Sequence, residues 1–420
     1  MALSQRDRDI LRRLAERQAA IATLPVHQER AELWRRLNQL EPTRPLVWIN
    51  EIPWHEMDVN GELRLQAEDP WAREQETILR RTLYQWDHMP CDMVVNDYLM
   101  APMAIYSTGL GIDEDVDIAV TDEANDVVSR RFRRQIIDPE DIQKIRAPVV
   151  THDEAETNAR LALMRDVFGD VIEVRPAGIK GRWFAPWDEL IRWWGVEDAM
   201  LDLVDRPQMV NDCMAHLLDC YLHELDQWET LNLLTCNNDN TRVGSGGYAY
   251  TDELPGDAYD PMHVRASDLW GSSTSQIFSA VSPDMHWEFG LQHEMRWLKR
   301  FGLTYYGCCE PLDRKMQILR RIPNLRKVSM SPWVDLERGA RELGTDYVFS
   351  YKPSPACLAE DHWRPDRVRN ELRDALERMR GCRVEIIMKD ISTVRYQPQR
   401  LWEWARIAME LTEALYPERS

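Results

Sequence analysis

The sequence lacks the features of a membrane protein and of a disulfide-stabilised secreted protein. No apolar run is long enough to span a bilayer, and residues 1–20 lack the apolar core of a signal peptide. The eight cysteines are spread over 420 residues, several of them inside apolar stretches, so they do not form a disulfide framework. We therefore expect a protein of the reducing cytoplasm that does not act in a membrane.

An excess of positive charge is also absent. The chain has 52 Lys and Arg against 71 Asp and Glu, which gives a net charge of −19. Nucleic acids and anionic membrane surfaces repel such a protein. The charge balance therefore argues against nucleic acid or an anionic membrane as the partner, and its plain interpretation is solubility.

Several common catalytic motifs are missing as well. The chain contains no GxxxxGK[ST] phosphate loop, no HExxH and no GxSxG, and no GxGxxG follows the first expected strand. These absences weigh against a phosphate-loop enzyme, a zincin, an α/β-hydrolase and a dinucleotide-binding fold.

The chain does contain a regular alternation of short apolar stretches with amphipathic helical segments. The apolar stretches, which we predict to be strands, are 44–50, 91–97, 171–176, 232–237, 303–308, 327–332, 346–353 and 383–390. Continuous apolar strands are typical of a parallel sheet that is buried on both faces, and eight strand–helix units fit a (β/α)8 TIM barrel. A doubly wound open sheet is the alternative.

The prediction is thus a single barrel domain over 1–420. Two charged helices within 1–43 precede the barrel. Residues 99–146 fit no strand–helix unit, and we interpret them as an insertion after the second strand. This segment contains a possible hairpin formed by VDIAVTD and VVSRRFRRQI.

In such barrels the active site lies at the carboxyl ends of the strands. This rule selects one set of residues: Glu51, Asn96, Asp97, Arg175, Asn237, Asn238, Asp239, Cys308, Cys309, Glu310, Ser331, Trp333, Lys352, Lys389 and Asp390. Charges beside a barrel core are costly unless they are used or paired. Some of them could therefore simply pair, as Lys352 could with Asp390.

The stretch LTYYGCCEP, 303–311, carries the most distinctive chemistry. Cys308, Cys309 and Glu310 follow a predicted strand without a spacer. Thiolates and carboxylates are ligands for zinc, so this strand end is a candidate metal site. The alternative is a buried cysteine pair without chemical consequence.

Other candidates lie in loops. Trp54 and His55 follow the first strand in PWHEM and could line a pocket. Tyr248 lies in the glycine-rich loop 238–262, which we predict to be a lid over the pocket. Trp333 could also line the pocket, and Lys352 is a further substrate-binding candidate.

The order of elements over roughly 44–415 resembles the uroporphyrinogen decarboxylase superfamily, which includes zinc-dependent corrinoid methyltransferases. YYGCCEP occupies the place of that branch's His-x-Cys metal pair, and Asp390 falls near its later cysteine ligand. Asp97 matches an aspartate of the decarboxylase branch. The arginine-rich loop of the decarboxylases is replaced by EIPWHEM, whose Glu51 would repel a porphyrinogen's carboxylates.

The resemblance implies a methyltransferase that moves a methyl group between a small substrate and a corrinoid or thiol acceptor. Zinc would be held by Cys308 or Cys309, Glu310 and Asp390. Asp97, Glu51 and Asn238 are the catalytic candidates, which would orient substrate or move a proton. No corrinoid-binding segment is visible, so a separate corrinoid protein would dock on the barrel.

Two other functions stay open. One is a metal-free decarboxylase or lyase with Asp97 at its polar centre. The other is a non-catalytic barrel that binds a corrinoid or tetrapyrrole. The resemblance, together with a surplus of tryptophan, 17 in all, also predicts a homodimer.

Overall fold

The structure, a computed structural model, describes residues 3–120 and 128–417, and its contacts divide the chain into two compact units. The terminal unit, which contains both chain ends, comprises Met1–Ala104, Asp153–Gly178 and Lys352–Ser420. The central unit comprises Ile105–His152 and Ile179–Tyr351. Both units combine helices with parallel strands, so the fold is a mixed α/β fold.

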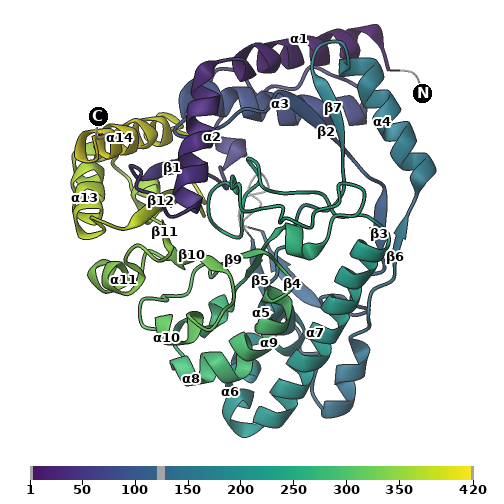
Figure 1. The fold of residues 1–420 in the computed structure, drawn as a ribbon, viewed down its shortest axis with the longest axis vertical. Helices are drawn as coiled ribbons and strands as arrows, with labels where there is room; N and C mark the ends of the chain where they lie inside the picture. Colours follow the sequence, from purple (N-terminus) through teal and green to yellow (C-terminus); the bar gives the residue numbers. More distant parts are fainter. Residues whose placement is uncertain (1–2, 121–127, 418–420) are drawn as a thin grey trace. The chain divides into compact units, whose positions relative to one another are not determined.

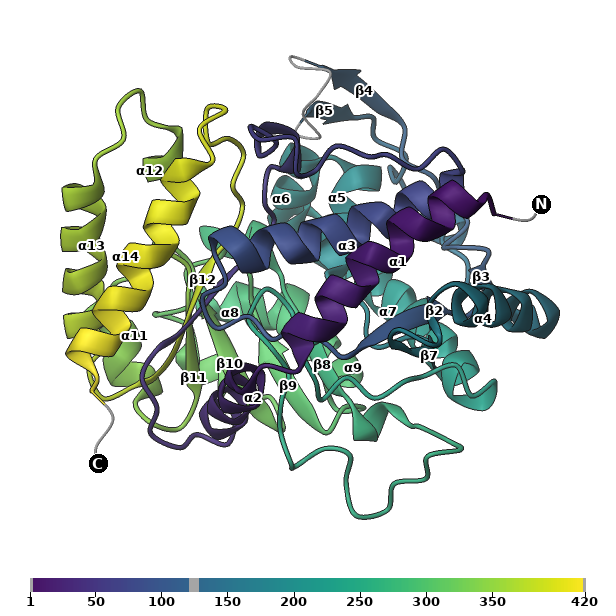
Figure 2. The ribbon, with the colours of Figure 1, turned by 90° about the horizontal axis from the view of Figure 1, so that it is seen from above.

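The terminal unit contains two parallel strand pairs. Strand β1 (Leu46–Ile49) pairs with β12 (Arg383–Met388), and β2 (Tyr98–Pro102) pairs with β7 (Glu173–Ala177). The helices of this unit are α1 (Gln5–Ala22), α2 (Pro25–Asn38), α3 (Pro70–His88), α4 (Glu154–Phe168), α12 (Ala356–Ala359), α13 (Pro365–Arg378) and α14 (Gln399–Leu415). Helices α1 and α3 pack together, as do α13 and α14 (Figure 2).

Side-chain caps fix where these helices begin. The Ser4 hydroxyl accepts a hydrogen bond from the amide of Asp7 in α1, and Asp69 accepts one from Ala72 in α3. Asp153 caps α4 in the same way through the amide of Glu156. Each cap satisfies a backbone donor that the first helical turn leaves unpaired.

The central unit is built on four parallel strands in the order β8 (Trp270–Ser273), β9 (Leu303–Tyr306), β10 (Leu325–Met330) and β11 (Val348–Tyr351) (Figure 1). The helices that connect these strands include α8 (Pro283–His286), α9 (Gln292–Leu298), α10 (Met316–Leu319) and α11 (Leu336–Leu343). A π-helical turn, Trp287–Leu291, joins α8 to α9.

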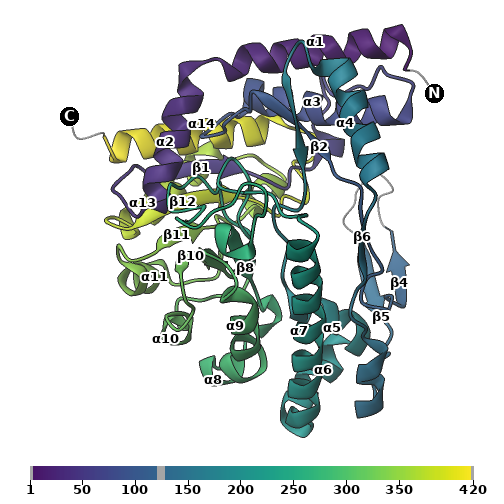
Figure 3. The same ribbon diagram turned by 45° about the vertical axis from the view of Figure 1, so that its right-hand side comes forward.

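A second group of helices precedes these strands in the central unit. It consists of α5 (Pro186–Trp194), α6 (Val196–Asp205) and α7 (Pro207–Thr230), which pack against one another (Figure 3). The unit also contains two antiparallel pairs, β3 (Ile105–Ser107) with β6 (Val150–His152), and β4 (Val116–Ala119) with β5 (Ser129–Phe132).

Six of the expected strands are present, as β1, β7, β9, β10, β11 and β12. The hairpin expected in 99–146 is confirmed as β4 and β5; the residues between them, 121–127, lie outside the described residues. Strand β2 at the start of that segment pairs with β7. The closed eight-stranded barrel, the single domain and the insertion stay predictions.

Residues 91–97 do not form a strand, contrary to the prediction. The Asp92 amide donates to the Val47 carbonyl at 2.9 Å, and the Asp92 carboxylate accepts from the Val47 amide at 2.7 Å. The Asp92 side chain thus accepts the hydrogen bond from β1 that a backbone carbonyl of a neighbouring strand would otherwise accept. Cys91, with φ of +42°, turns the chain away from an extended path.

Residues 232–237 were also wrongly predicted as a strand. They make a single bridge, between Ile179 and Leu234. The Asn237 side chain accepts from the Trp270 amide at 3.0 Å and donates to the Trp270 carbonyl at 3.0 Å, in place of a backbone ladder with β8. Strand β8 itself was not predicted, because WGSS contains no β-branched residue, although all four of its residues are buried.

Within the described residues, no helix combines the length and the apolar composition that crossing a membrane requires.

Candidate functional site

The centre of the candidate site is the turn that follows β9. The strand ends at Tyr306, and Gly307 has a φ of +98°, which glycine adopts without strain. A Cβ at this position would lie 2.4 Å from the Leu312 side chain. The chain therefore turns sharply here, and Cys308 and Glu310 lie in the turn, not on the strand.

Glu310 is fully buried and is held by neutral donors. The Thr274 hydroxyl lies 2.9 and 3.1 Å from its two carboxylate oxygens. The backbone amides of Cys308 and Ser275 donate to it at 2.9 and 3.3 Å. The carboxylate is thus fixed in orientation without a salt bridge among the described residues.

A second buried carboxylate, Glu294 of α9, lies on the other side of Ser275. The Ser275 hydroxyl donates to Glu294 at 2.5 Å, and the Tyr306 hydroxyl donates to its other oxygen at 2.8 Å. Burial raises the pKa of Glu294 to about 7, and the charge of Glu310 adds to the shift. Glu294 can therefore hold a proton near neutral pH.

A directed chain of hydrogen bonds leads to Glu294 from a buried lysine. Lys315 Nζ lies 3.0 Å from His286 Nδ1, and His286 Nε2 lies 2.7 Å from the Tyr306 hydroxyl. Burial lowers the pKa of His286 well below its usual range, so the ring is neutral, accepts from Lys315 and donates to Tyr306. Burial also lowers the pKa of Lys315 to about 8.

The helix geometry brings this chain together. The π-helical turn Trp287–Leu291 lies between His286 and Glu294, and turns of this kind are frequent at functional sites. Gly290 in the turn lies so close to Ser275 that a Cβ would be 2.9 Å from the serine hydroxyl. A glycine there lets Ser275 reach Glu294.

A pocket of about 420 Å³ lies beside this turn. We call it the acid pocket after Asp188, although two arginines also line it; its lining residues are Arg130, Phe132, Asp188, Ile191, Arg192, Val196, Gln276, Ile277 and Cys309. Asp188 lies in the first turn of α5 and accepts a hydrogen bond from Gln276 at 2.5 Å. Burial, reinforced by the charge of Glu310, raises the pKa of Asp188 to about 6.

The two neighbouring thiols do not complete a metal site. Cys308 Sγ and Cys309 Sγ are 3.5 Å apart, and Cys309 also lines the acid pocket. Across residues 3–120 and 128–417, no three His, Cys, Asp or Glu side chains are placed to hold a metal ion. The residues present therefore do not fit a catalytic zinc site with three protein ligands. Zinc stays a prediction, and we derive no step through it.

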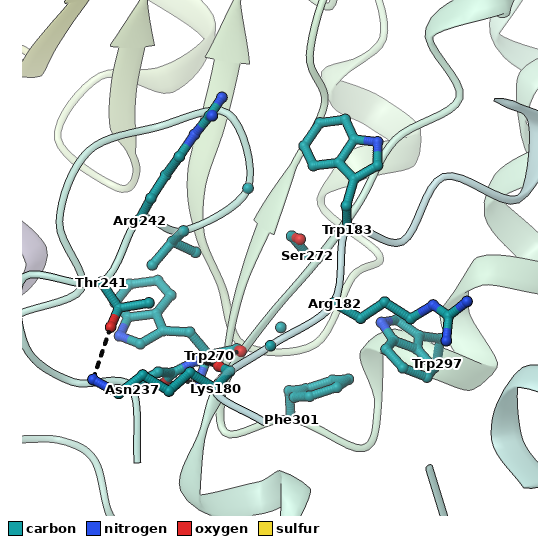
Figure 4. Close-up of a pocket in the computed structure, with 14 residues that line it drawn as sticks. Lys180, Arg182, Trp183, Asn237, Thr241, Arg242, Trp270, Ser272, Trp297 and Phe301 are labelled. Atoms are coloured by element: carbon teal, nitrogen blue, oxygen red, sulfur yellow. Dashed lines mark hydrogen bonds between the residues drawn. The ribbon is translucent and has the colours of Figure 1, made fainter. Parts of the chain in front are cut away.

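A second pocket in the central unit, of about 340 Å³, has a different character (Figure 4). We call it the cationic pocket, because Lys180, Arg182 and Arg242 line it. Its other walls are aromatic: Trp183, Trp270, Trp297 and Phe301. Lys180 forms an ion pair with Asp239 at 2.5 Å, and Arg182 forms one with the buried Glu224.

The predicted residues of the long loop lie near this pocket, mostly in structural roles. Asn237 lines it but is occupied by the backbone of β8, and Asn238 donates to the Leu254 carbonyl at 2.7 Å. Asp239 fixes Lys180. Tyr248 is buried, at 4% exposure. Within the loop Val243, Ala249 and Leu254 pack in a core cluster with Trp270, Leu303 and Tyr305, so part of the predicted lid is anchored.

Three predicted residues meet in the terminal unit. The Asp390 amide donates to the Glu51 carboxylate at 3.1 Å, and Lys389 Nζ lies 2.6 Å from Asp390 and 3.6 Å from Glu51. Burial and the neighbouring Glu51 raise the pKa of Asp390. These residues form an ion-paired cluster at the ends of β1 and β12. Both of its acids, Glu51 and Asp390, are paired with Lys389.

The remaining predicted residues of the terminal unit do not converge. The Arg81 guanidinium covers the Trp54 ring at 5.1 Å, and His55 lies 3.7 Å from Glu56. Asp97 is exposed and Asn96 is half-buried. Arg175 pairs with Glu173 at 2.5 Å and lies over the Tyr98 ring at 4.0 Å. Lys352 is buried.

In the central unit Ser331 is buried, whereas the Trp333 side chain is 77% exposed and does not line either pocket described above.

The fold of the chain resembles that of a methyltransferase. A solved methyltransferase from Methanosarcina mazei superposes with a TM-score of 0.50 at 13% sequence identity, over 91% of this chain and 98% of the other. At this identity the similarity shows the fold alone. No family model and no curated protein matches the sequence.

Sequence reasoning found Cys309 and Glu310 but missed the groups around them. Asp188 lies in an ordinary-looking amphipathic helix, and Lys315 and Glu294 carry no motif. The available signal was weak: Glu294 is one acid between apolar residues of a helix, and only the structure shows that it is fully buried.

Proposed function

We propose that the protein is a methyltransferase in which Asp188 acts as a general acid. The observation that carries this proposal is a carboxyl group of raised pKa, about 6, on the wall of a small-ligand pocket. The fold similarity to a methyltransferase supports the reaction class. A carboxyl group with a pKa near 6 keeps a protonated fraction close to neutral pH and can donate that proton during catalysis.

The proton is needed because oxygen and nitrogen are poor leaving groups. When a methyl ether or methylamine gives up its methyl group, the bond from carbon to the heteroatom breaks and its electron pair stays on the heteroatom. Asp188 would donate its proton to that atom and become a carboxylate. Glu310 supports this step electrostatically, because its charge keeps Asp188 protonated to higher pH.

The methyl acceptor would come from a partner. A corrinoid supplies a cobalt nucleophile when it is bound, and both pockets are of small-ligand size, about 340 and 420 Å³. We therefore propose that the corrinoid stays on a separate protein. A homodimer and a closed (β/α)8 barrel belong to the same proposal; light scattering at micromolar concentration that shows only monomer would refute the dimer.

The test is methyl transfer from a panel of methoxy and methylamine compounds to reduced cobalamin, followed by absorbance. Asp188→Asn should lower the rate at least tenfold, since a positioned general acid contributes about 10²–10⁴-fold. The matched control is Asp284→Asn, at an exposed aspartate of α8, which should keep the wild-type rate. Glu310→Gln should shift the fall in activity to lower pH. Equal rates for Asp188→Asn and wild type would refute the proposal.

A decarboxylase is the second candidate, and the cationic pocket favours it, since cations suit a substrate carboxylate. In that reaction the carbon–carbon bond breaks, carbon dioxide leaves, and Asp188 protonates the remaining carbanion. Release of carbon dioxide from carboxylate substrates, without methyl transfer, would select this candidate. Binding of a ligand with neither reaction would point to a non-catalytic barrel.

A further inference from the structure

The cationic pocket and the acid pocket have different lining residues, and the charged groups of the cationic pocket are all hydrogen-bond donors. Lys180 Nζ donates to Asp239 at 2.5 Å and to Thr241 at 3.2 Å, which leaves one of its three N–H groups available. Arg182 uses part of its five-donor guanidinium on Glu224. The two acids thus hold the cations in place and leave donor capacity for a ligand.

A buried donor in the pocket wall has no partner. Trp297 lines the pocket at 1% exposure, and its Nε1–H makes no hydrogen bond to any described residue. A buried N–H without an acceptor is rare and costly in a folded protein. This donor lies in the pocket wall with two cations and has no acceptor among the described residues.

The walls between the donors are flat and apolar. Trp270 and Phe301 line the pocket, and Trp183, 46% exposed, lines it from a position that solvent reaches (Figure 4). Trp297 is itself fixed by stacking on Phe184, with ring centroids 4.4 Å apart. Rigid aromatic walls favour a planar body between them.

We infer that the cationic pocket binds a carboxylate carried on a flat apolar body, such as an aromatic acid. The carboxylate accepts hydrogen bonds from Lys180, Arg182 and Trp297, and the ring packs on the tryptophans. Trp183 of the cationic pocket also interacts with Asp188 of the acid pocket and lowers its pKa. We further propose that this ligand is the methyl donor. That part of the inference rests on the proposed function.

The experiment measures binding without turnover, by calorimetry and tryptophan fluorescence on the full chain. The probe is 4-methoxybenzoate, compared with 4-methoxybenzamide, which keeps the ring without the charge, and with acetate, which keeps the charge without the ring. The acid should bind at least tenfold more tightly than either. Equal affinity for the acid and the amide, or no binding of the acid, overturns the inference.

Substitutions locate the site. Lys180→Gln should weaken binding of the acid about tenfold, and Trp297→Phe, which keeps the stacked ring, about fivefold. The controls are Lys299→Gln and Trp333→Phe, at exposed positions outside the pocket, which should bind like wild type. If the controls weaken binding as much as the pocket variants, the ligand lies elsewhere and the inference fails.

Asp188→Asn separates this inference from the proposed function. The variant should lose methyl transfer and keep wild-type affinity for 4-methoxybenzoate. A protein that binds the acid but never transfers methyl would refute the proposed function and leave the binding site standing.

Discussion

Each unit holds a pair of buried carboxylates, Glu76 and Asp92 in the terminal unit and Glu294 and Glu310 in the central unit, and the two pairs differ in their partners. In the terminal unit Glu76 accepts from the amides of Gln66 and Ala67 and from Arg80 at 2.7 Å, and Asp92 pairs with Arg44. In the central unit Glu294 receives hydroxyl donors alone, and neither it nor Glu310 has a cationic partner among the described ion pairs.

The difference lies in the protonation state that each environment favours. Backbone amides and guanidinium groups stabilise the ionised form, and the amides of Glu68 and Asp69 lower the pKa of the buried Asp7 against the effect of burial. Burial beside a second acid favours the neutral form, as in Glu294. Glu76 and Asp92 therefore pin loops, whereas Glu294 can store a proton.

The largest expected effect comes from breaking a loop-pinning acid. Glu76→Gln replaces one acceptor of the 66–67 amides by a donor and removes the negative charge that Arg80 pairs with, so the free energy of unfolding should fall by about 3 kcal/mol. Chemical denaturation measures this change. The control is Glu74→Gln, at an exposed position two residues before Glu76 in the same helix. Its free energy of unfolding should stay within about 0.5 kcal/mol of wild type. Equal losses in the two variants would contradict the pinning role.

Glu294 is expected to destabilise the folded protein when it is ionised, whereas ionised Glu76 stabilises it. Its folded pKa, about 7, lies above its ordinary value of 4.5, so the folded state binds more protons between these values and stability falls as pH rises through this window. The loss attributable to Glu294 is roughly 3 kcal/mol between pH 4.5 and 7. Glu294→Gln should remove most of this loss, whereas Glu288→Gln, on the exposed side of the π-helical turn, should not. Parallel stability curves for wild type and Glu294→Gln would show that the acid is not neutral.

Catalysis should follow the protonation of Asp188. Because only the protonated form donates, the rate should fall about tenfold per pH unit above pH 6, which corresponds to about 1.4 kcal/mol per unit. Initial rates from pH 5 to 8 measure this slope. The rate of Asp188→Asn should be low and should not change with pH over this range. A wild-type rate that rises with pH would assign the group as a base instead.

The smallest effect is expected at Cys309, the more accessible thiol of the pair. Cys309 is partly accessible at the pocket wall, so Cys309→Ser should change the free energy of unfolding by less than about 0.5 kcal/mol. Cys308→Ala, at a buried position, should cost about 1 kcal/mol. A larger loss for Cys309, together with zinc lost from the wild-type protein on chelation, would reinstate the metal site.

The parts of the fold that depend on local pattern could be predicted. Apolar continuity located β9 to β12, and the hairpin of β4 and β5 followed from its alternation. Strand β8 was not predicted because its serines are polar residues that only tertiary contacts bury. The segments at Asp92 and Asn237 failed because a polar side chain takes the place of a backbone partner, which no periodicity reveals.

The candidate site was predictable only where a strand end marks it. Cys309 and Glu310 lie in the turn that follows β9, so position along the chain sufficed. Asp188, His286, Glu294 and Lys315 come from different helices and loops, and their pKa shifts arise from burial that the sequence does not encode locally.

The π-helical turn sets the register between the two ends of the proton-storing network. The Gln292 amide donates to the Trp287 carbonyl five residues back, so the helix there holds one residue more than a regular α-helix would. The same residues wound as a regular α-helix would turn Glu294 by about 100° relative to His286. A change that straightens this turn without removing a residue is thus enough to disconnect the relay, although every one of its side chains is kept.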